Sequence, residues 1–432
     1  MKLNSSLNSL SQLLSAPVTP SAIFTLDNGL TVIHQHLPST PVVVADVWLR
    51  AGATREPENS SGMAHFLEHM IFKGTPALAP GVFDREIENR GGISNAATSH
   101  DYTHYFLTTA APYLEDTLPH LAELLLNAAI PEDEFVRERE VVLEEIRQAY
   151  DDPDWIGFQS LSESVYQHHP YGRSVLGTEQ ELMKHSPEAM RCFHRAHYQP
   201  ENMTVVIVGG IAQQPALELV SRTFQQFSKR CDCCPPQSQA VGKPVLAGIG
   251  RQELYLPRLE QARLLMAWTG PGVDQLRSAY GLDLLSVLLS EGRTSRLVRE
   301  LREEQQLVQA ISSNFSLQRD SSLFTISALL EPQHLERVES LICAHLEQLQ
   351  NTLVSQGELA RCKRLLCNDY AFSTETPNQL AGLYGYYNTI SEAKLAFIYP
   401  EQIQSFQAEE LQSLAQQYLS RHSYAVTVLK PC

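Results

Sequence analysis

The same pattern of elements occurs in both halves of the chain, and this repeat constrains the fold more than any other feature of the sequence. Residues 41–70 (PVVVADVWLRAGATREPENSSGMAHFLEHM) predict an alternating apolar strand with a tryptophan, a glycine-containing turn, a polar loop and a helix, and residues 260–289 (EQARLLMAWTGPGVDQLRSAYGLDLLSVLL) predict the same succession. Residues 197–210 and 418–431 each place a loop before an apolar strand near the end of a half. Such internal similarity indicates a duplicated domain.

A polar stretch, SKRCDCCPPQSQAVGKP at 228–244, separates the two halves. It contains two consecutive prolines and a glycine and has no periodicity, which is typical of a linker. We therefore expect a first domain at 1–230, a linker at 231–244 and a homologous second domain at 245–432. The chain of 432 residues is long enough for two hydrophobic cores.

The elements between the repeated strands indicate the α+β class. Residues 111–130 and 131–150 have apolar side chains at helical spacing. Residues 91–109 predict a strand, because β-branched and aromatic residues follow a Gly-Gly turn. Long helix pairs between hairpin-like strands favour mainly antiparallel sheets over a doubly wound sheet. No glycine-rich phosphate loop follows a strand, so no nucleotide site is predicted.

The charge of the chain excludes two kinds of partner. The net charge is −16, from 33 basic and 49 acidic residues, and the basic residues form no cluster. Nucleic acid and anionic membrane surfaces both require a positive surface. No apolar run approaches the roughly 20 residues that span a bilayer. We expect neither nucleic acid nor a membrane as a partner.

The N-terminal residues and the cysteines indicate a cytoplasmic protein. The first 26 residues contain no arginine and no long apolar core, so neither a transit peptide nor a secretory signal is predicted, although an organellar address is a weaker alternative. The eight cysteines are scattered, which favours a reducing compartment. The cluster CDCC at 231–234 lacks a second pair at zinc-ligand spacing. We interpret it as reduced cysteines in the linker.

The first half contains the short pattern HFLEH at residues 65–69, in a segment with helical character after Ser60 and Ser61, either of which suits a helix N-cap. At about 100° per residue, Glu68 lies at about −60° and His69 at about +40° from His65. Two imidazoles one turn apart suit a tetrahedral zinc ion, and a glutamate beside them can take a proton from water. The pattern fits a half-buried helix with two incidental histidines equally well.

A third ligand is available from the predicted helix at 131–150. When its apolar stripe, centred near Val142, faces the core, Glu144 points about 180° away from the core. Glu138 and Glu145 lie at the edge of the stripe, two turns apart. Buried carboxylates require a cation or a hydrogen bond. Glu145 is thus a plausible inward ligand, Glu144 a surface charge, and Glu138 a carboxylate that could orient a ligand from the outer shell.

An ordered set of motifs resembles the pitrilysin-like zinc metallopeptidases, the inverzincins with H-x-x-E-H, and among them the branch of mitochondrial processing peptidase and its bacterial relatives. HFLEHMIFKGT is followed by REREVVLEEIRQAYDDP. The resemblance covers nearly the whole chain, through DNGLTVI, GGISNAATSHDYTHY, HPYGRSVLGTEQEL, YQPENMTVVIVGG and EGRTSRLVRELREEQQL. It implies two homologous α+β domains that face each other around a central peptide-binding chamber.

The resemblance also assigns residues of the metal centre. It implies one Zn²⁺ per chain, held by His65, His69 and Glu145. Glu68 would be the general base for hydrolysis of a peptide bond by water, and Glu138 would be the outer-shell carboxylate of the active site.

A further implication concerns the strand at 93–98, which would pair with an extended peptide substrate. Asn95 and Ala96 correspond to an Asn-Ala pair that contacts substrate in relatives. The alternative for Asn95 is a turn-forming asparagine after Gly-Gly.

One departure from the family pattern bears on partners. Single-chain relatives have an arginine and a tyrosine separated by six residues in the second domain, where the pair holds substrate and stabilises the oxyanion. Here Arg302 is present, but Gln309 stands at the tyrosine position. We therefore expect the metal-bearing catalytic subunit of a heterodimer with a homologous partner, or else a homodimer.

Three classes of function follow from these observations. The first is a zinc-dependent endopeptidase that cleaves peptides or unfolded segments. The second is a non-catalytic core subunit with the same fold, and the third is a helix-rich binding module without zinc. The intact set of His65, Glu68, His69 and Glu145 favours the endopeptidase.

Overall fold

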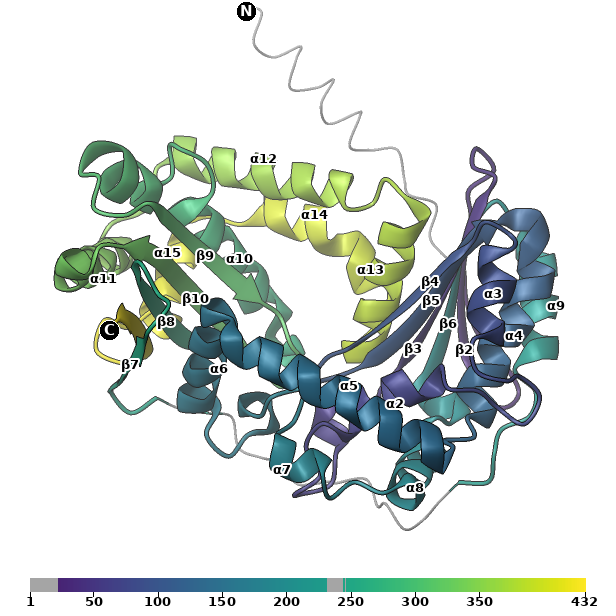
Figure 1. The fold of residues 1–432 in the computed structure, drawn as a ribbon. Helices are drawn as coiled ribbons and strands as arrows, with labels where there is room; N and C mark the ends of the chain where they lie inside the picture. Colours follow the sequence, from purple (N-terminus) through teal and green to yellow (C-terminus); the bar gives the residue numbers. More distant parts are fainter. Residues whose placement is uncertain (1–21, 231–243, 245) are drawn as a thin grey trace, which may run out of the picture.

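A computed structural model of the chain describes residues 22–230, 244 and 246–432 (Figure 1). The predicted N-terminal arm lies mostly outside the described residues. The CDCC cluster and nearly all of the predicted linker at 231–244 also lie outside them.

The first half contains a six-stranded sheet in the order β1-β2-β6-β3-β5-β4. All neighbouring strands are antiparallel except β2 and β6, which are parallel. Helices α2, α4 and α5 contribute to the core on one face of this sheet. The elements of this half are β1 (Ala22–Thr25), β2 (Thr31–His36), β3 (Val42–Leu49), α2 (Met63–Ile71), α3 (Val82–Glu88), β4 (Ile93–Thr98), β5 (Thr103–Ala110), α4 (Leu114–Asn127), α5 (Glu132–Asp151), α6 (Pro153–Tyr166), α7 (Glu179–Leu182), α8 (Pro187–His197), β6 (Met203–Gly209) and α9 (Gln213–Thr223).

The second half repeats this topology in a five-stranded sheet of order β7-β11-β8-β10-β9. Its order and directions match those of β2-β6-β3-β5-β4, including the parallel pair, here β7 and β11. The predicted duplication and α+β class are confirmed. The elements are β7 (Ile249–Leu256), β8 (Ala262–Pro271), α10 (Leu276–Ser290), β9 (Ala310–Ser316), β10 (Ser321–Leu330), α11 (Leu335–Asn351), α12 (Gln356–Phe372), α13 (Pro377–Ile390), α14 (Leu395–Ser405), α15 (Ala408–Tyr418) and β11 (Tyr424–Pro431).

Each half also covers a sheet of the other half with one helix. Helix α13 packs on β3 and β6, where Tyr384 and Trp48 belong to one buried cluster. Gly385 allows this close approach, because a Cβ there would come within 2.1 Å of the Trp48 indole nitrogen. Conversely, α6 packs on β8 and β11, with Leu161 buried in a cluster with Ala425. The proposed boundaries at 1–230 and 245–432 separate the strands of the two sheets but not these helices.

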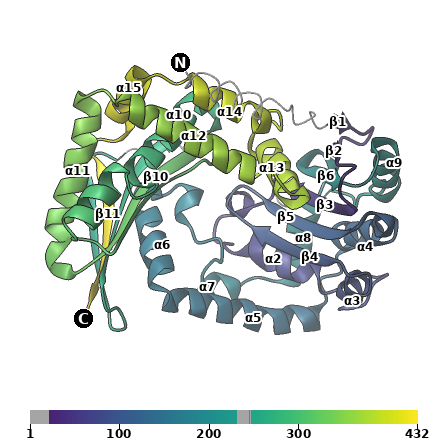
Figure 2. The same ribbon diagram turned by 90° about the horizontal axis from the view of Figure 1, so that it is seen from above.

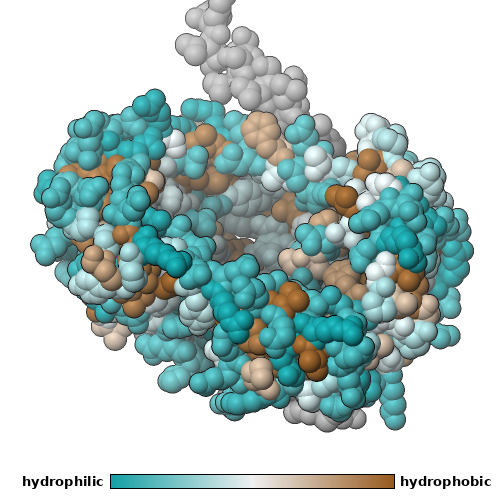
Figure 3. All heavy atoms as spheres, viewed as in Figure 1, coloured by the Kyte–Doolittle hydropathy of each residue, from teal (hydrophilic) through white to brown (hydrophobic). Residues whose placement is uncertain are grey.

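The two sheets lie on opposite sides of a hollow at the centre of the molecule (Figures 1 and 3). A cavity of about 280 Å³ in this region is lined from both halves, by Tyr102 and Tyr166 of the first and Tyr386 of the second. Hydrogen bonds connect the halves beside it: Asp101 accepts from the backbone N–H of Arg319 (3.1 Å), and the Tyr171 hydroxyl accepts from the backbone N–H of Asp320 (3.1 Å). The predicted arrangement of two domains around a central space is therefore observed.

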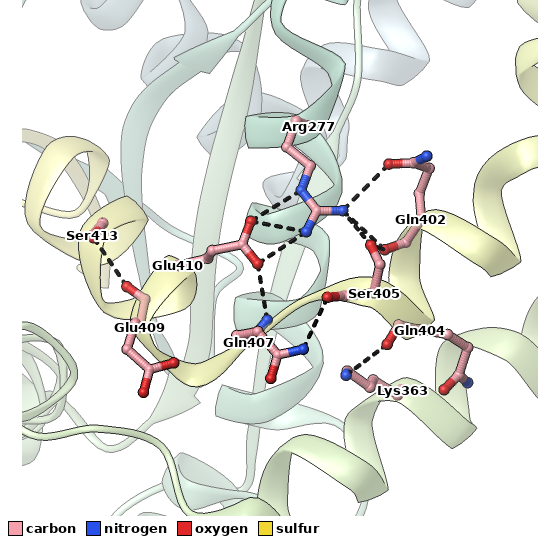
Figure 4. A network of polar contacts seen from close by, with 9 residues as sticks. All are labelled: Arg277, Lys363, Gln402, Gln404, Ser405, Gln407, Glu409, Glu410 and Ser413. Carbon is pink, nitrogen blue, oxygen red and sulfur yellow. Dashed lines mark hydrogen bonds and ion pairs between the residues drawn. The ribbon is translucent and has the colours of Figure 1, made fainter.

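A network of polar contacts connects helices α10, α14 and α15 of the second half (Figure 4). Arg277 of α10 donates to both carboxylate oxygens of Glu410 on α15, at 2.8 and 3.0 Å. Its guanidinium also bonds Ser405 at the end of α14 (2.6 Å) and lies over the Phe406 ring, 3.6 Å from its centroid. A planar guanidinium can satisfy several partners at once, and here it joins three helices.

Two local expectations need refinement. Residues 91–109 form a hairpin of β4 and β5 rather than one strand, because the backbone of Ser99 bonds back to Tyr102 and reverses the chain. The segment predicted as a helix at 111–130 begins with a 3₁₀ turn, Ala111–Tyr113, and its helix ends at Asn127.

The described cysteines are not all reduced. Cys343, Cys362, Cys367 and Cys432 are free, but Cys192 is disulfide-bonded, so the expectation of reduced cysteines is wrong for Cys192. Cytoplasmic localisation stays a prediction. Within the described ranges, no helix combines the length and the apolar character needed to cross a membrane.

Candidate metal centre

Helix α2 begins at a glycine held in place by surrounding backbone. Gly62 is the N-cap residue with φ 83°, and a Cβ on it would come within 2.5 Å of the Leu176 carbonyl oxygen. The expectation of a Ser60 or Ser61 N-cap was therefore wrong, because only glycine fits this left-handed position. The fully buried Glu56 replaces the serine cap by accepting bonds from the N–H groups of Gly62 (3.1 Å) and Ala64 (2.9 Å).

The three predicted ligands meet between α2 and α5. The Nε2 atom of His65 lies 3.6 Å from the Oε2 atom of Glu145, and the Nε2 atom of His69 lies 3.5 Å from the same oxygen. One ligand atom from each of the three residues lies within 4.8 Å of the others. Among the described residues, no other group of three or more His, Cys, Asp or Glu side chains has this geometry.

The distances between the ligand atoms fit tetrahedral coordination of a metal ion. Zinc bonds of about 2.0–2.1 Å place neighbouring ligand atoms of a tetrahedron roughly 3.3 Å apart, close to the two distances to Glu145. Two imidazoles and a carboxylate form a donor set typical of catalytic zinc, which leaves the fourth position for water or substrate. The Glu145 side chain is 40 % exposed, so solvent can reach the centre. The residues therefore fit Zn²⁺.

The angular prediction on α5 agrees with the positions of its glutamates. Glu145 faces the two histidines, whereas Glu144 is exposed and pairs with Arg147 at 3.5 Å. Glu138 lies two turns from Glu145 and is 7 % exposed. The stripe centred on Val142 is buried, as the apolar pattern predicted.

Glu138 and Lys73 form the outer shell of the centre. The Glu138 Oε1 atom lies 2.9 Å from Nδ1 of His69, and its Oε2 atom lies 2.6 Å from the Lys73 ammonium. The pKa of Glu138 is lowered: burial would raise it, but the bonds from His69 and Lys73 outweigh burial. An ionised Glu138 can only accept, so Nδ1 of His69 donates and its Nε2 lone pair faces Glu145.

The two histidines differ in their protonation. Burial, and next the proximity of His69, lowers the pKa of His65 to about 3, so its ring is neutral at physiological pH. Burial would also lower the pKa of His69, but the hydrogen bond to Glu138 and the nearby charges of Glu145 and Glu68 raise it. A cation bound at the centre would replace the proton on Nε2 of His69, because ligation requires neutral imidazole.

Glu68 lies beside the ligands on α2 and contacts β4. Its Oε2 atom accepts a hydrogen bond of 2.6 Å from the Thr98 hydroxyl. Burial raises the pKa of Glu68 above its ordinary value, although the Thr98 bond opposes this. A raised carboxyl pKa suits a group that must take and return a proton near neutral pH.

Glu138→Gln is expected to weaken zinc binding roughly 10- to 100-fold, the usual cost of losing an outer-shell partner. The amide is a weaker acceptor for His69 and leaves the Lys73 charge without its partner. Zinc affinity should be measured by competition with a chromogenic chelator at constant pH. Glu140→Gln, on the exposed face of the same helix, is the control, and equal affinities for both variants would contradict this role of Glu138.

Asn95 and Ala96 lie on β4, the edge strand of the first sheet. Strand β4 packs beside α2 (Figure 2). Asn95 is exposed, and its side-chain oxygen accepts a 2.9 Å bond from the backbone N–H of Ala96. This bond occupies the backbone N–H of Ala96, the second of the two residues predicted to contact substrate.

Arg302 and Gln309 lie in the second half, on either side of the turn before β9. Arg302 belongs to a π-helical segment, Val298–Glu304 (η6), and its guanidinium bonds Glu303 at 2.7 and 2.9 Å. The backbone N–H of Gln309 pairs with the carbonyl of Leu329 on β10. The role of this pair stays a prediction.

Three residues near the centre were not predicted from the sequence. Lys73 follows His69 by four positions but lies two residues past Ile71, the last residue of α2, so it reaches Glu138 from the turn after the helix. Thr98 and Glu56 reach α2 from a strand and a loop, and no local sequence signal marks such contacts.

The comparisons with known proteins agree with this geometry. Residues 31–179 match the family model described as insulinase (peptidase family M16), and residues 184–366 match the model described as peptidase M16 inactive domain. The zinc protease PqqE of Helicobacter pylori is 31 % identical over 94 % of this chain and 92 % of its own length. The fold and the His-His-Glu centre thus define a metallopeptidase-like protein.

The chain belongs to peptidase family M16. A solved protease structure from Helicobacter pylori matches it with a TM-score of 0.89 and 29 % identity, covering 95 % of this chain and 99 % of that one. A chain in a structure of complex III₂ from Candida albicans matches with a TM-score of 0.79 at 13 % identity, covering 95 % of each chain, which shows a shared fold alone.

Proposed function

We propose that this chain is a zinc-dependent endopeptidase that cleaves peptides or unfolded segments. The observation that carries the proposal is the convergence of His65, His69 and Glu145 on one point, with Glu68 on the same helix face. The names of the relatives support zinc protease chemistry at the level of the family. The assignment to the processing-peptidase branch is part of the proposal.

His65, His69 and Glu145 would hold one zinc ion, which supplies Lewis-acid activation of water and of the scissile carbonyl. Glu68 then takes a proton from the attacking water and delivers it to the leaving amine. Glu138 holds the His69 ring with Nε2 toward Glu145, the orientation that ligation would require. The edge of β4 at Asn95 and Ala96 would pair with the extended substrate, and such main-chain pairing suits a broad rather than a sequence-specific peptidase.

The proposal is tested by incubating the purified chain with a panel of unstructured fluorogenic peptides, with and without a chelator. Cleavage that the chelator abolishes and zinc restores is expected. A folded, protease-resistant domain serves as a control substrate and should remain intact. Cleavage that persists at full rate in the chelator would refute the zinc mechanism.

The alternative is a non-catalytic core subunit of the same fold. The description of the second half's family model as an inactive domain and the fold shared with a complex III₂ chain are compatible with it. The complete set of ligands and base in the first half favours the enzyme. A non-catalytic subunit would give no cleavage with any peptide, alone or with a homologous chain.

We further propose that a homologous partner supplies the Arg/Tyr pair, because Gln309 replaces the tyrosine. Mixing this chain with a homologue that has Arg-x₆-Tyr should raise kcat roughly 100-fold, the typical value of one oxyanion donor. The partner with its tyrosine changed to phenylalanine is the control and should give little gain. Full activity of the chain alone, with no increase on mixing, would contradict the heterodimer.

A further inference from the structure

Thr98 is the last residue of β4, and its hydroxyl bonds directly to the candidate base. The distance from its Oγ1 atom to Oε2 of Glu68 is 2.6 Å, within the short range of hydrogen bonds to an ionised acceptor. The two residues are 30 positions apart in the chain and belong to different elements. This bond therefore joins the edge strand to the metal-binding helix.

Which group donates in this bond follows from the number of hydroxyl protons available. Thr98 has one hydroxyl proton, and its Oγ1 atom also lies 3.2 Å from Oγ1 of Thr103. Thr103 can give its own proton to Thr98 or to the carbonyl of Ala51, 3.1 Å away. A carboxylate is the stronger acceptor, so Thr98 donates to Glu68 and receives from, or merely contacts, Thr103.

No other described side chain takes the place of Thr98. The hydroxyls of Tyr105 and Tyr198 lie near enough for the charge of Glu68 to contribute to their raised pKa values, but their hydroxyls bond each other at 2.7 Å. Within the described part of the chain, no other group hydrogen-bonds to the Glu68 carboxylate, and its Oε1 atom has no such partner. One carboxylate oxygen is thus held and the other is left available.

We propose that Thr98 is a positioning residue that holds Oε2 of Glu68 and thereby leaves Oε1 as the oxygen that takes the proton from water. The inference rests on the proposed peptidase function. Thr98 also connects the substrate-binding strand to the base, because it lies two residues after Ala96 on the same face of β4. A peptide paired along this edge would lie on the strand that orients the base.

Thr98→Val retains the side-chain shape and removes the hydroxyl. We expect kcat to fall roughly 10- to 100-fold, as for a misplaced catalytic group, with KM and zinc affinity unchanged. Thr98→Ser restores the donor and should restore most of kcat. Thr109→Val is the matched control, because this buried threonine on β5 has a hydroxyl without a hydrogen-bond partner.

A crystal structure of Thr98→Val gives a readout that needs no turnover: Glu68 should occupy more than one orientation, whereas Thr98→Ser should keep one. A single, unchanged Glu68 orientation or a kcat within about twofold of wild type would overturn the inference. Equal losses in Thr98→Val and Thr98→Ser would assign the effect to packing and overturn it as well. Failure of the peptidase proposal is distinguishable, because the wild type would then cleave no peptide, or Glu68→Gln would cleave at the wild-type rate.

Discussion

Glu68→Gln is expected to lower kcat for peptide cleavage by roughly 10³- to 10⁴-fold, near the upper end of what general acid–base catalysis contributes. Glutamine has nearly the shape of glutamate and can keep the contact with Thr98, but it cannot take a proton. Glu68 is not among the three residues whose ligand atoms converge, so the variant should still bind one zinc ion per chain. The expected result is a folded, zinc-loaded and inactive protein.

The measurement compares initial rates on one fluorogenic peptide and metal content by mass spectrometry. Glu140→Gln removes an exposed carboxylate of α5 and serves as the charge-matched control with wild-type rates. If the wild type and Glu68→Gln cleaved equally, the cleavage would come from a different site or a contaminant. The endopeptidase proposal would then fail.

Glu145→Gln and its neighbour Glu144→Gln should differ sharply in zinc binding. Loss of one of three ligands is expected to weaken zinc affinity more than about 100-fold, beyond the cost of an outer-shell change. Glu144 is exposed and, among the described residues, pairs only with Arg147 at 3.5 Å, so its substitution should change affinity and stability within experimental error. The two variants have the same composition, which removes net charge as an explanation.

Chelator competition gives the zinc affinity of both variants, and cleavage rates at saturating zinc show whether added metal restores activity. Thermal unfolding of the metal-free proteins serves as the folding control. Equal zinc affinities for the two variants would contradict the assignment of Glu145 as a ligand. A loss of zinc affinity in Glu144→Gln alone would mean that Glu144, and not Glu145, is the side chain of α5 that points toward the metal centre.

The convergence of His65, His69 and Glu145 could be predicted because it depends on local helix geometry. His65 and His69 are one turn apart, and the apolar stripe around Val142 sets the orientation of α5. Once that stripe is buried, Glu145 must lie at its edge and Glu144 must face solvent. The duplicated topology was predictable for a similar reason, since the order of strands and helices is repeated along the chain.

The supporting contacts could not be predicted because they join segments that are distant in sequence. Glu56 caps α2 in place of a serine, and this depends on how the preceding loop folds under the helix. Thr98 meets Glu68 only because β4 lies beside α2. The helical patterns of α6 and α13 likewise give no sign that each covers the sheet of the other half.

The proposal that this chain is a zinc-dependent endopeptidase is tested most directly by measuring its zinc content together with its activity. The chain should be purified without added metal, assayed, stripped with a chelator, and assayed again after zinc is returned. We predict about one zinc ion per chain, loss of peptide cleavage on stripping and recovery when zinc is added back. Cleavage at full rate by the stripped protein, or a folded protein that binds no zinc at His65, His69 and Glu145, would contradict it.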